Sequence, residues 1–169
     1  MTSAELLAEA FGRVHGVVHE VVDGSSTEDL AVRLEGEANS MAWLVWHLTR
    51  VQDDHIAGVA GVEQVYTSGG WAQRFGFPFD VGDIGYGQGS SQVAAVIAEG
   101  ETLIGYFDAV YEATLQFVAQ LTDDDLDRVV DEHWDPPVTM GVRLLSVVSD
   151  TLQHAGQAAY VRGILLDRS

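Results

Sequence analysis

Residues 138–166 read VTMGVRLLSVVSDTLQHAGQAAYVRGILL. Within this stretch one set of side chains recurs every three or four residues, which is the period of one face of an α-helix. The set consists of Leu144, Val147, Thr151, Ala158, Val161 and Leu165. Pro136 and Pro137 lie just before the stretch and must end any preceding helix, because proline lacks the backbone N–H that a helix needs. The sequence therefore predicts a long last helix over about residues 138–166.

Three earlier segments have the same period, and we expect helices over about residues 3–23, 40–58 and 90–121. Short helical turns are expected near residues 27–34 and again after Thr122. These assignments give four long helices along the chain, with no strands alternating between them.

This order of elements predicts an all-α fold, specifically a four-helix bundle. Residues 59–89 are rich in glycine and aromatic side chains and keep neither a strand nor a helix period, so we expect a long irregular loop between helices two and three. A loop of that length permits a crossover connection in place of simple up-and-down order. With 169 residues, the chain is in the usual size range of one domain, and a single domain over residues 1–169 is expected.

The charge and the cysteine count limit the possible functions. The chain has 8 Lys and Arg against 26 Asp and Glu, a net charge of −18, which repels both phosphate backbones and anionic lipid surfaces. We therefore expect a protein that binds neither nucleic acid nor membranes. No apolar run approaches the roughly 20 residues needed to span a bilayer, and the N-terminus lacks a basic segment followed by an apolar one, so a cytoplasmic protein is expected. The chain contains no cysteine, so any thiol chemistry must use a thiol that binds from outside.

Three ionisable side chains lie on apolar helix faces. Asp150 and His154 are four residues apart on the last predicted helix and therefore share one face, while His47 lies between Trp43 and Val51 on the second. Burying a carboxylate that has no partner costs several kcal/mol, a free energy similar to that of breaking an ion pair. One divalent cation would compensate all three groups, whereas the alternative is a hydrogen-bonded Asp–His pair with His47 satisfied separately.

The composition of this set indicates the kind of metal site. Two imidazoles and one carboxylate leave at least one coordination position open for water or substrate, which is typical of catalytic rather than structural zinc. Zinc or nickel suits these ligands best.

Two segments resemble a known group of proteins. Residues 36–48, GEANSMAWLVWHL, resemble the second-helix segment of the DinB-like superfamily, and residues 149–157, SDTLQHAGQ, resemble its last-helix metal motif. Over nearly its whole length the chain is similar to the branch related to the metal-binding domain of mycothiol-dependent maleylpyruvate isomerase. The resemblance implies that His47, Asp150 and His154 hold the metal. Asp150 departs from the glutamate of the isomerase branch, and its side chain is one methylene shorter.

The resemblance also implies an activity. It predicts a metal-dependent thiol transferase or isomerase that uses mycothiol, a low-molecular-weight thiol, and a small electrophile. Two alternatives remain open, namely a non-catalytic stress-related or regulatory metal-binding module and a metal-dependent hydrolase. Catalytic and thiol-binding residues are not identified, and a homodimer is expected because helical bundles of this kind often pair.

Other polar and aromatic residues are weaker candidates. His15 and His19 are also four residues apart, but they flank the apolar stripe of the first helix, so we expect them on a solvated face. Asp54 shares the face of His47 and is a candidate for a supporting hydrogen bond. A group of three aromatic side chains and one arginine in the long loop either lines a pocket mouth above the metal or packs on the core. It consists of Trp71, Arg74, Phe75 and Phe77.

Overall fold

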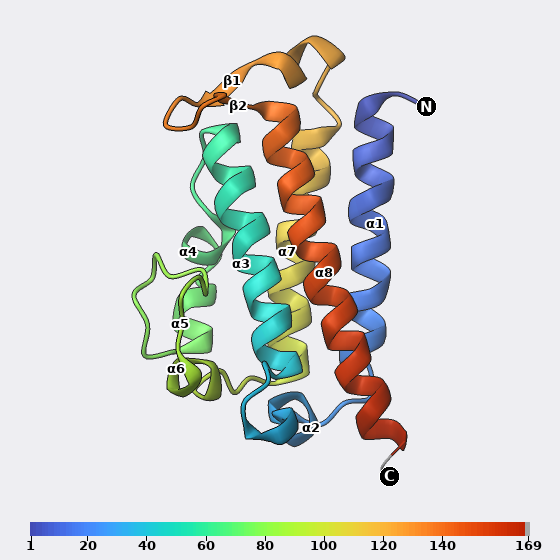
Figure 1. Ribbon diagram of the computed structural model, residues 1–169, viewed down its shortest axis with the longest axis vertical. Helices are drawn as coiled ribbons and strands as arrows, with labels where there is room; N and C mark the ends of the chain where they lie inside the picture. Colours follow the sequence, from blue (N-terminus) through green and yellow to red (C-terminus); the bar gives the residue numbers. More distant parts are fainter. Residues whose placement is uncertain (168–169) are drawn as a thin grey trace.

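Four long helices run side by side along the longest axis of the molecule (Figure 1). In the computed structural model, which describes residues 1–167, they are α1 (Ser3–Val22), α3 (Met41–Ala60), α7 (Gly100–Val118) and α8 (Met140–Asp167). The all-α bundle predicted from the helical periods is confirmed.

The helices form a closed square. α1 and α3 each pack against both α7 and α8, so α1 and α3 occupy opposite corners. α1 and α8 run in one direction, and α3 and α7 run in the other (Figure 1). Because α3 and α7 are parallel, the chain must return along the bundle between them. The predicted long connection makes this return, which confirms the crossover order.

Short elements occupy the connections. They are α2 (Thr27–Ala31), η1 (Leu34–Gly36), α4 (Val65–Ser68), α5 (Trp71–Phe75), α6 (Ser90–Ala94) and η2 (Asp123–Asp127). The turns expected near residues 27–34 and after Thr122 are present. The connection between α3 and α7 is irregular overall but contains α4, α5 and α6, so it is more ordered than a plain loop.

The helix predicted over residues 90–121 is wrong in its first part, because the chain breaks between α6 and α7. Val96 lies in this break and is buried in the main core. Gly100 then begins α7 so close to α1 that a Cβ on it would lie 2.9 Å from Val22 Cγ1. Packing against α1 thus overrides a pattern that was continuous in the sequence.

A small hairpin that the sequence did not predict precedes α8. β1 (Val129–Asp131) pairs antiparallel with β2 (Val138–Thr139), and the two prolines lie in the turn between them. The last helix consequently begins at Met140, two residues later than expected.

α3 is buried on nearly all sides, because the crossover segment covers the side that faces away from the bundle. Even Arg50 and Asp53 are buried in it. Arg50 donates hydrogen bonds to the carbonyl oxygens of Val81 (3.2 Å) and Asp83 (3.2 Å). A buried charge of this kind is tolerated only when it is fully hydrogen-bonded, and here it fixes the crossover segment to α3.

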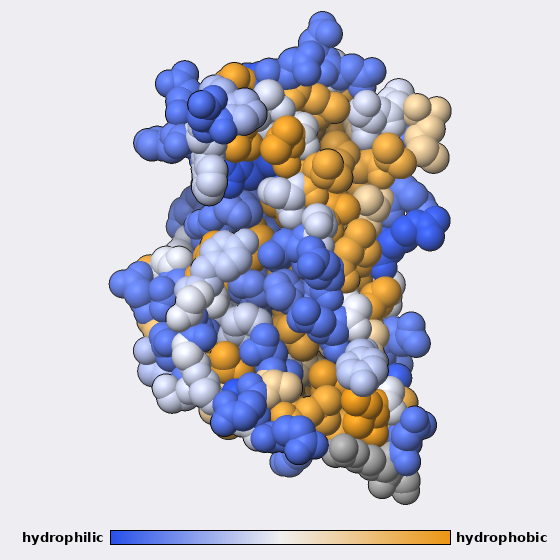
Figure 2. Space-filling model, in the orientation of Figure 1, coloured by the Kyte–Doolittle hydropathy of each residue, from blue (hydrophilic) through white to orange (hydrophobic). Residues whose placement is uncertain are grey.

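The surface is mixed, with apolar side chains gathered over the upper part of α8 and the adjoining α1 (Figure 2). The exposed apolar residues of these helices include Leu6, Val142, Leu145 and Leu152. In the described part of the chain, no helix has both the length and the hydropathy needed to cross a bilayer.

Candidate metal centre

The three ligands expected from the sequence come together between α3 and α8. His47 and the pair Asp150 and His154 each offer one ligand atom, and these atoms lie within 4.8 Å of one another. The His154 Nε2 atom is 3.7 Å from Asp150 Oδ2, and the imidazole centroids of His47 and His154 are 4.8 Å apart. The aspartate side chain therefore reaches the group although it is shorter than glutamate.

The ring of His47 is held in one orientation. Its Nδ1 is hydrogen-bonded to the backbone carbonyl of Ile84, and the Trp43 ring stacks on it with centroids 4.5 Å apart. A carbonyl oxygen can only accept, so Nδ1 carries the proton and Nε2 keeps a free lone pair. This arrangement is the one in which a histidine binds a metal through Nε2.

Gly85 allows the crossover segment to approach this ring. Its φ is +101°, a conformation that side chains disfavour, and a Cβ on it would clash with His47 Nδ1. From the sequence, Gly85 is only part of the long irregular loop. That the Ile84-Gly85 pair lies against His47 is visible only in the folded chain.

His154 and Asp150 complete the arrangement from α8. The Nδ1 of His154 donates to Gln157 Oε1 at 2.9 Å, which leaves its Nε2 free as well. Asp150 Oδ1 is buried and has no hydrogen-bond partner among residues 1–167. Buried polar atoms are almost always paired, so an unpaired carboxylate oxygen beside two free imidazole nitrogens fits a site for a cation.

Burial sets the charge state of the candidate ligands. Desolvation lowers the pKa of His47 from 6.5, opposed by its hydrogen bond to the Ile84 carbonyl, while His154 lowers it and Asp150 raises it. His47 is therefore neutral at physiological pH, as a metal ligand must be. Tyr86 packs edge-on against His47, with centroids 5.3 Å apart. Partial burial and the charge of Asp150 raise the pKa of Tyr86, so its hydroxyl remains a donor.

Arg50 supports the site from a distance. It lies one turn after His47 on α3, and its hydrogen bonds to Val81 and Asp83 hold the segment that presents Ile84. Arg50 was not among the candidates expected from the sequence. The signal available was that it is the only Lys or Arg among residues 41–60, the span of α3.

Some expected neighbours lie elsewhere. Asp54 makes its contacts away from His47. Its Oδ1 accepts a hydrogen bond from Gln64 Nε2 at 2.8 Å, and its Oδ2 lies 3.4 Å from His55 Nδ1. The three aromatic side chains expected near the site pack on the core instead, while Arg74 is exposed and lies over the Trp71 ring, 4.5 Å from its centroid. The aromatic contacts are Trp71 on Tyr106, Phe75 on Tyr66 and Tyr106, and Phe77 on Trp46.

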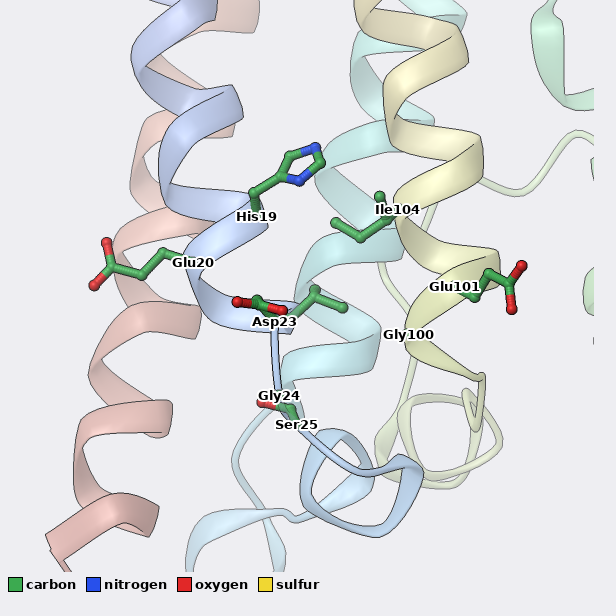
Figure 3. Close-up of a pocket in the computed structure, with 9 residues that line it drawn as sticks. His19, Glu20, Asp23, Gly24, Ser25, Gly100, Glu101 and Ile104 are labelled. Carbon is green, nitrogen blue, oxygen red and sulfur yellow. The ribbon is translucent and has the colours of Figure 1, made fainter.

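His15 and His19 do not lie on a plain solvated face, which corrects the sequence-based expectation. Both are half-buried, and both Nε2 atoms are within hydrogen-bond distance of Asp108 Oδ1 on α7, at 3.1 Å and 2.7 Å. The pattern of α1 alone cannot reveal this group, because its third member comes from another helix. Next to it, a groove of about 530 Å³ lies between the end of α1 and the start of α7 (Figure 3).

Comparison with known proteins agrees with this architecture. The model of the mycothiol-S-transferase family matches residues 6–166. A crystal structure of a conserved protein from Enterococcus faecalis is 28% identical, covers 99% of each chain and superposes with a TM-score of 0.91. None of the curated proteins compared with the sequence matches it.

Proposed function

We propose that this chain, which belongs to the mycothiol-S-transferase family, joins a low-molecular-weight thiol to a small electrophile at a divalent ion held by His47, Asp150 and His154. The observation that carries the proposal is the unpaired, buried Asp150 Oδ1 beside two imidazoles whose Nε2 atoms are free.

The proposed chemistry follows from the ligand set. A divalent ion with an open coordination position would lower the pKa of a thiol that enters it, as such ions do for bound water and thiols. The thiol proton would pass to solvent, and the thiolate sulfur would form a bond to the electrophilic carbon. The bond from that carbon to the leaving group would break, and the leaving group would depart with the electron pair. The thiol comes from outside, because the chain has no cysteine. Mycothiol is the proposed thiol because of the family, and zinc or nickel is the proposed ion.

The chain's own side chains prepare this site. The Ile84 carbonyl and Gln157 keep both Nδ1 atoms protonated, which leaves both Nε2 atoms free to hold an ion. Trp43 stacks on the His47 ring and Tyr86 packs edge-on against it, so the two rings limit how the imidazole can turn. Tyr86 keeps its proton at neutral pH, and we propose that its hydroxyl donates a hydrogen bond to the electrophile or to its leaving group.

The alternatives expected from the sequence are less well supported. A non-catalytic module would be favoured by a fourth protein ligand that closes the site, yet within residues 1–167 the group contains only three. A hydrolase would use the same site with water as nucleophile, and the family favours a thiol. The expected homodimer stays a prediction, for which the exposed apolar side chains of α8 provide the candidate surface.

The proposal is tested with cobalt-substituted protein in a His19→Gln background, which removes the second histidine cluster. Titration with mycothiol is expected to change the visible spectrum, because sulfur that enters the open position alters the ligand field. The same protein should consume mycothiol in the presence of a chloro-nitroaromatic electrophile, whereas His154→Ala should show neither effect. An unchanged spectrum across millimolar thiol would refute thiolate activation.

A further inference from the structure

We infer that the chain carries a second divalent-cation site, formed by His15, His19 and Asp108 between α1 and α7, which binds a labile first-row ion such as Zn²⁺ or Co²⁺. This inference does not depend on the proposed transferase activity, because no residue is shared between the two groups.

The spacing of the donor atoms carries the inference. One ligand atom from each of the three residues lies within 4.8 Å of the other two. Donors that share a tetrahedral ion at about 2.0–2.1 Å are roughly 3.4 Å apart. The two Nε2 atoms lie 3.1 Å and 2.7 Å from Asp108 Oδ1, so only small side-chain shifts would admit an ion.

The two imidazoles are already arranged as a pair. His15 and His19 are one helical turn apart, and their ring centroids are 4.3 Å apart. The ring of His15 is held by Tyr111 at 4.3 Å and by Phe107 at 5.8 Å. Both Nε2 atoms face the same carboxylate oxygen, and an ion bound there would take the place of the protons in these two N–H···O hydrogen bonds. A neutral imidazole with its proton on Nδ1 presents Nε2 as a ligand.

The surroundings favour a cation and leave room for exchange. Figure 3 shows His19 projecting from α1 toward α7, with Asp23 below it and Glu20 and Glu101 pointing away to either side. These carboxylates add negative charge around the groove without competing as ligands, in a chain of net charge −18. The side chains of His15, His19 and Asp108 are 33%, 39% and 44% exposed, so water can complete the coordination shell.

The alternative is a purely hydrogen-bonded cluster, in which both Nε2 atoms donate to Asp108. Such a cluster needs no ion and would not take up cobalt. The two arrangements therefore differ in a measurable property of the intact protein.

The test is a Co²⁺ titration of metal-free protein, followed by visible absorption and by calorimetry. Asp108→Asn keeps the shape of the side chain but removes the anionic ligand, and His19→Gln removes an imidazole. Glu101→Gln is the matched control, since it removes one negative charge from the same helix and the same groove without removing a ligand. The titrations are repeated in a His154→Ala background to remove the buried site.

In that background we expect one Co²⁺ equivalent whose affinity falls by more than about 100-fold in Asp108→Asn and in His19→Gln, because each change removes a ligand rather than an orienting partner. Glu101→Gln should retain it within about twofold, which is the size of a screened surface-charge effect. Binding that is absent, or that is equal in Asp108→Asn, His19→Gln and Glu101→Gln, would overturn the second site. Helicity measured by circular dichroism verifies that each variant is folded.

Discussion

Two clusters of the same composition, each with two histidines and one aspartate, lie on opposite sides of this bundle. The buried cluster between α3 and α8 contains His47, which is only 2% exposed, whereas every member of the cluster between α1 and α7 is at least one third exposed. Identical ligands can thus be placed in very different surroundings by the same fold.

The partners of the imidazoles differ as well. In the buried cluster both Nδ1 atoms have acceptors, namely the Ile84 carbonyl and Gln157, and Asp150 Oδ1 is unpaired among the described residues. In the exposed cluster both Nε2 atoms converge on Asp108, and the structure places no acceptor for either Nδ1 within residues 1–167. Orienting partners raise metal affinity and burial makes an empty site costly, so we expect the buried cluster to hold its ion more tightly.

The largest expected effect is the loss of the tightly held ion in His154→Ala. Loss of a partner that orients a ligand weakens metal binding by at most roughly 100-fold. Removal of one of the three proposed protein ligands should weaken it by more than that. Elemental analysis after dialysis against a weak chelator measures the ion that remains. His133→Ala is the control, because that side chain is 96% exposed on the hairpin. Equal metal content in wild type and His154→Ala would mean that the buried cluster is only hydrogen-bonded and does not hold the ion.

A smaller effect is expected from Gly85→Ala, which changes no ligand. The added methyl group displaces the ring of His47. The affinity of the buried cluster for the ion should therefore fall about 10- to 100-fold, as when an orienting partner is lost. Gly87→Ala is matched, since its φ of +73° is also positive but a Cβ there meets nothing within 4 Å. Both changes should lower stability by about 1–2 kcal/mol through the backbone.

Competition with a chelating dye separates affinity from stability in this pair. Thermal melting of the metal-free variants gives the backbone cost of each substitution. If Gly85→Ala and Gly87→Ala bind the ion equally well, orientation of His47 by the crossover segment does not contribute to affinity.

The smallest effect concerns the metal-free protein at low pH. Because burial lowers the pKa of His47 below 6.5, the unfolded chain takes up a proton at a higher pH than the folded chain. The stability that His47 contributes is present above pH 6.5 and is lost as the pH falls through the folded pKa. His47→Gln should therefore reduce the loss of unfolding free energy on acidification, by at most about 1.4 kcal/mol per pH unit.

Urea denaturation at several pH values, with chelator present, measures this slope. A slope that is the same in wild type and His47→Gln would mean that His47 is not desolvated in the metal-free state.

The sequence by itself determined the four long helices, apart from where the third begins, and the face on which each candidate ligand lies. The period of side chains along α1, α3 and α8 is a local property, and the four-residue spacing of Asp150 and His154 fixes their common face whatever surrounds them. The composition likewise fixed the charge and the need for an external thiol. The helix faces depend only on residues within about two helical turns, and the charge depends only on the composition.

Only the tertiary structure decided which helices are neighbours and what the crossover segment touches. The Ile84 carbonyl reaches His47 across 37 residues, and Asp108 reaches His19 across 89. Neither segment carries a periodic signal that indicates its partner, because such contacts depend on how the four helices pack and on where the chain returns. The break before α7 has the same cause, since the close approach of Gly100 to Val22 on α1 outweighs a helical pattern that continues through it.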